Sequence, residues 1–340
     1  MQKLLKITFF ATFALSIAPV ALAQLSVVPD PVQYIVAPEA PQPGQKVTIA
    51  AQGVGGFLGG ATITWTKDGK VALSGLGETT FSFTAGALGT QTRVQVRIVS
   101  SSQGTITHDF TFLPSLVNLI WEADTSVPPL YRGKSLYTAG SSIKVVAFPT
   151  IVVKGVRVPS GSLTMQWFVQ DTPAPEQSGL GRTSISFAGD QLQAQETVAV
   201  DVYYGANKVA RGEITIPTSQ PLVLLYVKDP LRGVVYDTVL PTSIALNAKE
   251  FTVQAVPYFF SNSSLKNRSV TYGWTLNDDE AVGPNSAKGI LTLRQAGVGQ
   301  GAAQLAVTLQ NTESDKFVQT ANAVLQLVFG QSSGSSLFGL

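Results

Sequence analysis

The chain of 340 residues contains no cysteine and one histidine, His108. Disulfide bonds and thiolate metal ligands are therefore excluded, and a zinc site made of several imidazoles is excluded with them. A Ser/His/Asp triad would have to use His108, and no strand–turn–helix elbow that presents a nucleophilic serine accompanies it. No Walker or dinucleotide-binding signature occurs. We therefore expect a structural or solvent-facing His108, no catalytic residue and no bound cofactor.

Charge is also scarce, because Asp, Glu, Lys and Arg together make up 13% of the residues. The 23 basic residues include Lys3 and Lys6, so a chain without residues 1–23 has 21 of them against 21 acidic residues. A near-neutral chain is a poor partner for nucleic acid or for an anionic membrane. We expect no nucleic-acid partner.

Residues 1–23 have the pattern of a secretory signal peptide. Lys3 and Lys6 form its basic start, residues 7–15 form a mostly apolar core, and Ala21-Leu22-Ala23 is a small-x-small cleavage site. The apolar run is short for a bilayer span, so membrane contact is expected only if this leader stays uncleaved. The predicted location is the periplasm, the extracellular medium or the cell surface.

Three of the four tryptophans, Trp65, Trp167 and Trp274, mark a repeat. They lie 102 and 107 residues apart, which is one β-sandwich per interval. A strand with alternating apolar residues precedes each tryptophan, at Val47/Ile49/Ala51, Ile143/Val145/Ala147 and Phe251/Val253/Ala255. Two more alternating strands follow each tryptophan. The first is at Phe81/Phe83, Ile185/Phe187 and Leu291/Leu293. The second is at Val94/Val96/Ile98, Val198/Val200/Val202 and Leu305/Val307/Leu309.

A period of two gives each strand one buried side and one solvent-facing side, as in antiparallel sheets. Many short strands joined by Gly and Pro turns indicate an all-β protein. We predict three tandem Ig-like antiparallel β-sandwich domains after a signal peptide, with each tryptophan buried in its own core. The predicted segments are a signal peptide 1–23, Ig-like domains 24–114, 115–218 and 219–330, and a flexible C-terminal tail 331–340.

The run from Trp65 through Asp68-Gly69 to Phe81-Ser82-Phe83 and Val94-Gln95-Val96 resembles PKD-type and related bacterial Ig-like domains. Those domains carry a Trp-bearing strand, an Asp-Gly turn and a late Val-x-Val strand. The resemblance covers most of the chain after the leader. It implies the fold and a surface location, and it implies no catalytic residue.

The chain departs from this family pattern in two respects. A Gly-x-Tyr before the late strand is missing, and the second and third modules have Gln170-Asp171 and Asn277-Asp278 in place of Asp-Gly. Residues 121–134, which open the second module, are similar to uncharacterised exported proteins of candidate-phylum bacteria.

Residues 127–134 lie outside the strand pattern and mix apolar, aromatic and basic side chains. Loops carry binding sites more often than strands do. The segment either covers an edge of a sandwich or contacts a partner, and Tyr131 and Arg132 are the candidate contact residues.

The segment after Phe329 is rich in Gly and Ser up to Ser336 and then apolar, with Leu337, Phe338 and Leu340. Burying these three side chains would yield several times about 1.5–3 kcal/mol. Ordering about ten residues costs about 1–2 kcal/mol each, so the two effects nearly cancel. We therefore expect a disordered tail that only a partner orders, and a tail without any partner is the alternative.

The densest acidic cluster, Asn277-Asp278-Asp279-Glu280, falls at an expected turn. Carboxylate oxygens of Asp278, Asp279 and Glu280 could bind Ca²⁺, although their spacing matches no Asp-x-Asn-x-Asp-Gly loop. A solvated turn is the alternative. Separated pairs such as Glu122/Asp124 offer acid–base groups, but nothing isolates one pair from the others.

The repeats, the leader and the shortage of catalytic side chains favour a non-catalytic exported β-sandwich array with a structural or adhesive role at a bacterial cell surface, within a pilus or envelope assembly. Its expected partners are other cell-surface proteins or glycans. An array of carbohydrate-binding modules with exposed aromatic side chains is the alternative. A secreted hydrolase that uses His108 or a carboxylate pair is a weaker one.

Overall fold

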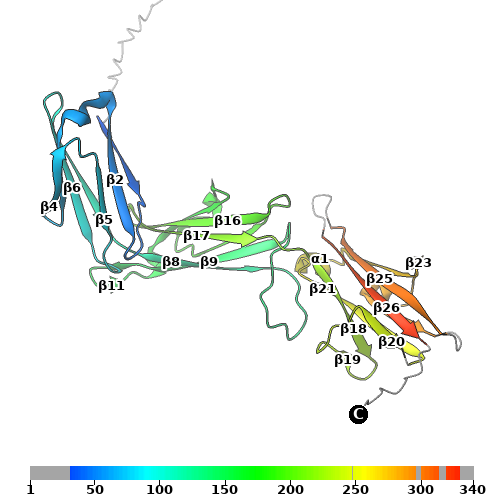
Figure 1. The fold of residues 1–340 in the computed structure, drawn as a ribbon. Helices are drawn as coiled ribbons and strands as arrows, with labels where there is room; N and C mark the ends of the chain where they lie inside the picture. The colour runs from blue at the N-terminus through cyan, green and yellow to red at the C-terminus, as the bar shows by residue number, and fades with distance from the viewer. Residues whose placement is uncertain (1–30, 247, 296–299, 314–318, 330–340) are drawn as a thin grey trace, which may run out of the picture.

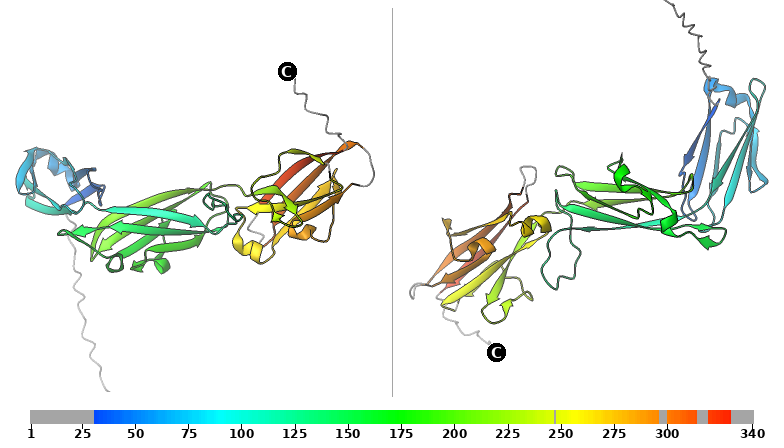
Figure 2. Two further views of the ribbon diagram at one scale, coloured as in Figure 1. Left: turned by 90° about the horizontal axis from the view of Figure 1, so that it is seen from below. Right: turned by 180° about the vertical axis from the view of Figure 1, so that it is seen from behind.

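The computed structural model describes residues 31–246, 248–295, 300–313 and 319–329, and these form three β-sandwiches in series (Figures 1 and 2). We call the sandwiches modules 1, 2 and 3, and they comprise strands β1–β7, β8–β17 and β18–β26. The predicted all-β class with tandem Ig-like sandwiches is confirmed. Within these described ranges, no helix is long and apolar enough to cross a membrane.

Module 1 packs the three-stranded sheet β1-β2-β5 against the four-stranded sheet β4-β3-β6-β7. In β6, Val94, Val96 and Ile98 are buried and the residues between them are exposed, as a period of two predicts. The elements are β1 (Val32–Ala37), β2 (Lys46–Gly53), the 3-10 segment η1 (Val54–Gly60), β3 (Thr62–Lys67), β4 (Lys70–Leu76), β5 (Thr80–Thr84), β6 (Thr92–Ser100) and β7 (Gly104–Phe112).

Module 2 packs the sheet β15-β9-β8 against β13-β12-β16-β17, where β14 also pairs with β12. A separate short hairpin, β10-β11, follows β9. The elements are β8 (Leu116–Ala123), β9 (Ser142–Thr150), β10 (Val152–Val153), β11 (Val156–Arg157), η2 (Ser160–Ser162), β12 (Thr164–Val169), β13 (Thr172–Pro173), η3 (Pro175–Gln177), β14 (Gly179–Leu180), β15 (Ser184–Ala188), β16 (Gln195–Tyr204) and β17 (Asn207–Pro217).

Module 3 packs β19-β18-β21-β24 against β20-β26-β25-β22-β23. Strand β20 runs parallel to β26, with Ser243 beside Gln326 and Leu246 beside Phe329. The elements are β18 (Leu222–Asp229), β19 (Gly233–Val234), β20 (Ser243–Leu246), β21 (Glu250–Tyr258), α1 (Asn262–Lys266), β22 (Val270–Leu276), β23 (Asp279–Glu280), η4 (Ser286–Lys288), β24 (Ile290–Arg294), β25 (Gly301–Asn311) and β26 (Thr320–Phe329).

The three tryptophans of the repeat are each buried in a separate core, as predicted. Trp65 and Trp167 are 0% exposed and Trp274 is 2% exposed, in three distinct apolar clusters. The indole Nε1 of each ring donates to a backbone carbonyl 12 to 15 residues further along the chain, at Glu78, Arg182 and Ser286. The polar edge of each large ring is therefore satisfied inside the sandwich.

The turn after each tryptophan strand has the same conformation in all three modules. Both residues have positive φ, at 49° and 78° in Asp68-Gly69, 48° and 59° in Gln170-Asp171, and 51° and 69° in Asn277-Asp278. Two successive positive φ values are typical of a type I′ hairpin turn, whose twist matches that of the flanking strands. The missing glycines therefore leave the turn unchanged, and Asp171 and Asp278 hold a left-handed backbone that glycine adopts with less strain.

Modules 1 and 2 are joined by a tight backbone bridge. The N–H of Gly89 donates to the carbonyl oxygen of Pro114 over 3.0 Å, and that of Ser115 donates to Pro41 over 3.2 Å. Gly89 has a φ of +73°, and a Cβ added there would lie 2.7 Å from the side chain of Val152 in module 2. The close approach of the two modules therefore depends on glycine at this position.

Candidate functional site

The segment between β8 and β9 leaves module 2 and pairs with module 3. The N–H of Ser126 donates to the carbonyl oxygen of Phe260 over 2.7 Å, and the N–H of Phe259 donates to that of Ser126 over 2.7 Å. Thr125 forms an antiparallel bridge with Ser261 beside them. These backbone bonds form a short two-stranded ladder between the modules, so the junction is more than a covalent linker.

A buried polar cluster near the end of the β8–β9 loop also connects modules 2 and 3. The hydroxyl of Thr138 donates to the carbonyl oxygen of Phe259 over 2.7 Å and accepts a hydrogen bond from Nε2 of Gln319 over 2.6 Å. The Oε1 of Gln319 accepts from the N–H of Ser261 over 3.0 Å. Thr138 and Gln319 are almost fully buried, and a satisfied polar network in a buried setting specifies one arrangement of its parts.

An aromatic cluster continues from this polar junction toward the surface. The ring of Tyr131 meets Tyr258 edge-on at 5.9 Å and Phe259 at 6.2 Å between centroids. The hydroxyls of Tyr226 and Tyr258 lie 2.5 Å apart, and the ring of Tyr236 lies 5.5 Å from that of Tyr226. Burial raises the pKa of Tyr258, and the hydrogen bond with Tyr226 adds to the effect, so the hydroxyl stays neutral at physiological pH.

Three of these rings line a cavity of about 670 Å³ between the β8–β9 loop and module 3, which we call the junction pocket. Tyr131, Tyr236 and Tyr258 contribute aromatic surface, and Arg132 and Asp237 contribute opposite charges. The full lining is Pro128, Pro129, Leu130, Tyr131, Arg132, Tyr236, Asp237 and Tyr258. A pocket with apolar faces and a few polar groups at a boundary between modules is a common setting for ligand binding.

A cation–π contact holds the returning part of the loop. The Nζ of Lys134 lies 3.2 Å from the centroid of the Trp121 ring. Burial lowers the pKa of Lys134, and the charge of Glu122 opposes that shift. Trp121 is therefore partly covered by its own loop, which this contact ties back to module 2.

The other residues singled out in the sequence lie apart from this pocket. Asp278 and the neighbouring Asp279 and Glu280 are exposed at the hairpin after β22. Among the residues that the structure describes, no group of three or more His, Asp or Glu side chains is placed to hold a metal ion. The Ca²⁺ site stays a prediction. The exposed ring of His108 stacks on Tyr34 at 4.6 Å between centroids.

The remaining candidates, Leu337, Phe338 and Leu340, lie outside the described residues. Tyr131 and Arg132 both line the junction pocket, and the ring of Tyr131 packs against Tyr258 of module 3. Sequence reasoning missed Tyr236 and Tyr258, because no signal in the sequence connects them to residue 131.

Sequence reasoning also missed a resemblance between two exposed loops. Pro129-Leu130-Tyr131-Arg132-Gly133 follows the first strand of module 2, and Pro230-Leu231-Arg232-Gly233 follows that of module 3. Leu130 is 87% exposed and Leu231 is 96% exposed. The shared Pro-Leu and Arg-Gly pairs were the available signal.

No protein-family model matches the chain, and no curated protein matches it. Among solved structures, three N-terminal domains of the bacteriophage RB49 Hoc capsid protein are 13% identical, with a TM-score of 0.24, over 88% of this chain and 98% of that one. The fibronectin-III array of a RIM-binding protein is 12% identical, with a TM-score of 0.27, over 89% and 98%. A Bacteroides ovatus protein, SGBP-B, solved with a mixed-linkage heptasaccharide, is 9% identical, with a TM-score of 0.22, over 87% and 70%. Similarity at this level carries no conclusion about function.

Proposed function

We propose that this protein is a non-catalytic structural element of a bacterial cell surface, which holds an adhesive or assembly partner at a fixed distance. The observation that carries the proposal is the buried bond between Thr138 and Gln319, which with the neighbouring backbone ladder braces modules 2 and 3. Flexible tethers between domains show no such contacts, so a braced array is suited to act as a spacer.

The junction between modules 1 and 2 also supports a spacer role. Lys208 of module 2 forms ion pairs with Glu39 of module 1 at 3.2 Å and with Asp201 at 2.9 Å. Asp201 is buried and also forms an ion pair with Arg211 at 3.0 Å. Lys208 is therefore positioned by a carboxylate of its own module while it contacts Glu39 of module 1. Export rests on the leader pattern of residues 1–23, and the PKD-type resemblance supports a surface location.

Two measurements test this function. Spin labels on Val71→Cys and Val282→Cys report the distance between modules 1 and 3, and the chain contains no other cysteine. A stiff spacer gives one narrow distance distribution, whereas a broad distribution removes the spacer role. Antibody labelling of intact source cells tests location, and a protein found only in the cytoplasm would contradict export.

Glycan binding at the junction pocket is a second candidate function. The observation that favours it is the set of three tyrosines, Tyr131, Tyr236 and Tyr258, beside the charged Arg132 and Asp237. Aromatic faces with adjacent polar groups suit a sugar ring, which has apolar faces and a hydroxyl rim.

A glycan array separates the two candidates. If the pocket binds sugar, Tyr131→Ala lowers the affinity for the bound glycan at least about tenfold, which corresponds to ~1.4 kcal/mol. The matched control is Tyr204→Ala, which removes an exposed tyrosine of module 2 outside this pocket. Equal loss in both variants, or no glycan bound by the unaltered protein, eliminates the glycan candidate and leaves the spacer role untouched.

A further inference from the structure

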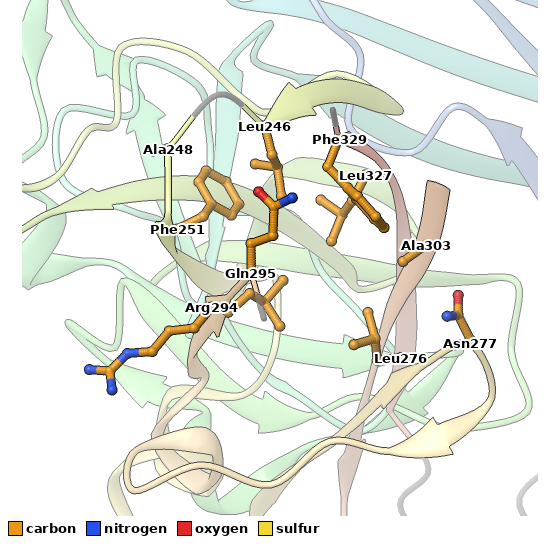
Figure 3. Close-up of a pocket in the computed structure, with 11 residues that line it drawn as sticks. Leu246, Ala248, Phe251, Leu276, Asn277, Arg294, Gln295, Ala303, Leu327 and Phe329 are labelled. Atoms are coloured by element: carbon orange, nitrogen blue, oxygen red, sulfur yellow. The ribbon is translucent and has the colours of Figure 1, made fainter. Parts of the chain in front are cut away.

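Module 3 contains an apolar cavity of about 300 Å³ between its two sheets, at the end where β26 finishes (Figure 3). Phe251 and Leu293 line it from one sheet, and Leu327 and Phe329 line it from the other. Ala303 on β25 also faces the cavity. We call this space the end cavity.

The same position in modules 1 and 2 is occupied by larger side chains. The repeat tryptophan of each module pairs with a valine on the neighbouring strand, which is Val96, Val200 and Val307 in modules 1, 2 and 3. Four positions before these valines stand Thr92, Glu196 and Ala303. These three pair in turn with Phe112, Ile216 and Leu327. Module 3 therefore has the smallest side chain at a position where the other two modules carry a larger one.

Module 2 fills this position with an aromatic residue from its own loop. Tyr137 is 0% exposed, belongs to the module 2 core and donates its hydroxyl to Glu196 over 3.2 Å. In module 1, the rings of Phe83 and Phe112 meet at 5.2 Å at the same end. The corresponding residues of module 3 are Leu293 and Leu327, which occupy less volume, whereas Phe251 stands where modules 1 and 2 have the smaller Val47 and Ile143.

We propose that the segment following β26 supplies an aromatic side chain that fills the end cavity of module 3. Phe338 of the same chain is the proposed occupant of the end cavity, by analogy with Tyr137 in the core of module 2. An apolar cavity of about 150 Å³ is sufficient for a benzene-sized ring, so the end cavity has room for a phenylalanine side chain. The inference does not depend on the proposed spacer function.

The position and composition of the segment identify it as the occupant. Phe329 lines the end cavity, and Phe338 follows it by nine residues, a span of up to about 30 Å when extended. The residues between them are mostly Gly and Ser, so the chain can reverse with a low loop-closure cost. A short flexible connection also gives a millimolar effective concentration, which favours the segment's own module over a second copy.

This proposal is an alternative to the sequence-based expectation that only a partner orders the segment. That expectation set the burial of three free apolar side chains against the ordering of about ten residues. It took no account of a preformed cavity beside the start of the segment, whose own apolar walls also gain from being covered.

Disulfide trapping tests the proposal, because the chain has no cysteine of its own. Arg294→Cys at the cavity rim is combined with Gly339→Cys, which leaves Phe338 and the cavity intact. Mild oxidation of dilute protein is expected to join the pair within one chain, at least about tenfold faster than the control pair Asn322→Cys and Gly339→Cys. Asn322 lies on β26 at the opposite end of the module.

Three results of the cross-linking experiment would overturn the proposal. Cross-linked dimers would place the segment on a second copy, and equal rates in test and control pairs would show no preference for the cavity. An unchanged rate after Phe338→Ser is added to the test pair would remove the phenylalanine from the contact. As a second measurement, the chain lacking residues 330–340 should bind more of an anilinonaphthalene dye than the intact chain, and equal binding contradicts a filled cavity.

Discussion

Nε2 of Gln319 donates to the hydroxyl of Thr138 over 2.6 Å, and this bond joins residues 181 positions apart in the chain. The same hydroxyl donates to the carbonyl oxygen of Phe259, so one threonine side chain connects a loop of module 2 to two segments of module 3. Because all of this is buried, each lost bond leaves a polar group with no access to water.

Thr138→Val should therefore weaken the junction between modules 2 and 3. The valine keeps the shape but leaves Gln319 and the carbonyl of Phe259 unsatisfied, at a cost of about 1–3 kcal/mol. Thermal unfolding and small-angle scattering check the result, and we expect a lower Tm and a wider range of interdomain angles. Thr238→Val, at an exposed threonine, is the control and should change neither quantity.

Trp167→Ala should cost about 3–5 kcal/mol, because a large ring with no exposed surface leaves a cavity. The three cores are separate, so the loss should fall mainly on module 2. Hydrogen exchange resolved by peptide measures the protection of each module. Trp121→Ala, at a partly exposed tryptophan, should cost less, and equal loss of protection in all modules would contradict separate cores.

Asp278→Gly should stabilise module 3 by about 0.5 kcal/mol. A non-glycine residue with φ near 69° carries strain of about 1–2 kcal/mol, of which the higher chain entropy of glycine offsets about 0.5–1 kcal/mol. The reverse change, Gly69→Asp, should destabilise module 1 by a similar amount. Denaturant midpoints measure both. Repeating them with Ca²⁺ tests the acidic cluster, since a Ca²⁺-dependent rise in midpoint that Asp278→Gly abolishes would establish metal binding.

Tyr258 should contribute to a loss of stability at alkaline pH. Its pKa is raised in the folded state above the ordinary value of 10.0, mainly by burial. A raised folded-state pKa gives a contribution that is fully present below about pH 10 and is lost as the pH rises further. The stability advantage of the unaltered protein over Tyr258→Phe should therefore shrink as the pH rises from about 10 to about 11. A difference that stays constant over this range would refute the assignment.

The cores could be predicted because their signal is local. Alternation along Val94, Val96 and Ile98 follows from the pleat of a strand, and a tryptophan at the same place in each repeat marks the layer between two sheets. The hairpin turns were less accessible, because Gln170-Asp171 is a weak turn signal and the flanking strands impose its conformation.

The junction pocket could be predicted only in part. Residues 127–134 stood out by breaking the strand pattern, but their position depends on contacts such as Tyr131 with Tyr258, which lie far apart in sequence. The end cavity could not be predicted from the sequence, because it also depends on contacts between distant residues. It arises from the small volume of Ala303, and that volume matters only once strand register places it opposite Leu327.

The parallel pairing of β20 with β26 bears on how module 3 responds to a mechanical pull. Tension along the array draws β18 toward module 2 and β26 in the opposite direction. When the pull runs along these strands, their ladders to β21, β20 and β25 are loaded in shear. Bonds loaded in this way share the force and must break together, whereas a hairpin pulled open at its end loses them one at a time. Pulling module 3 apart along these strands should therefore need more force than opening a hairpin from its end.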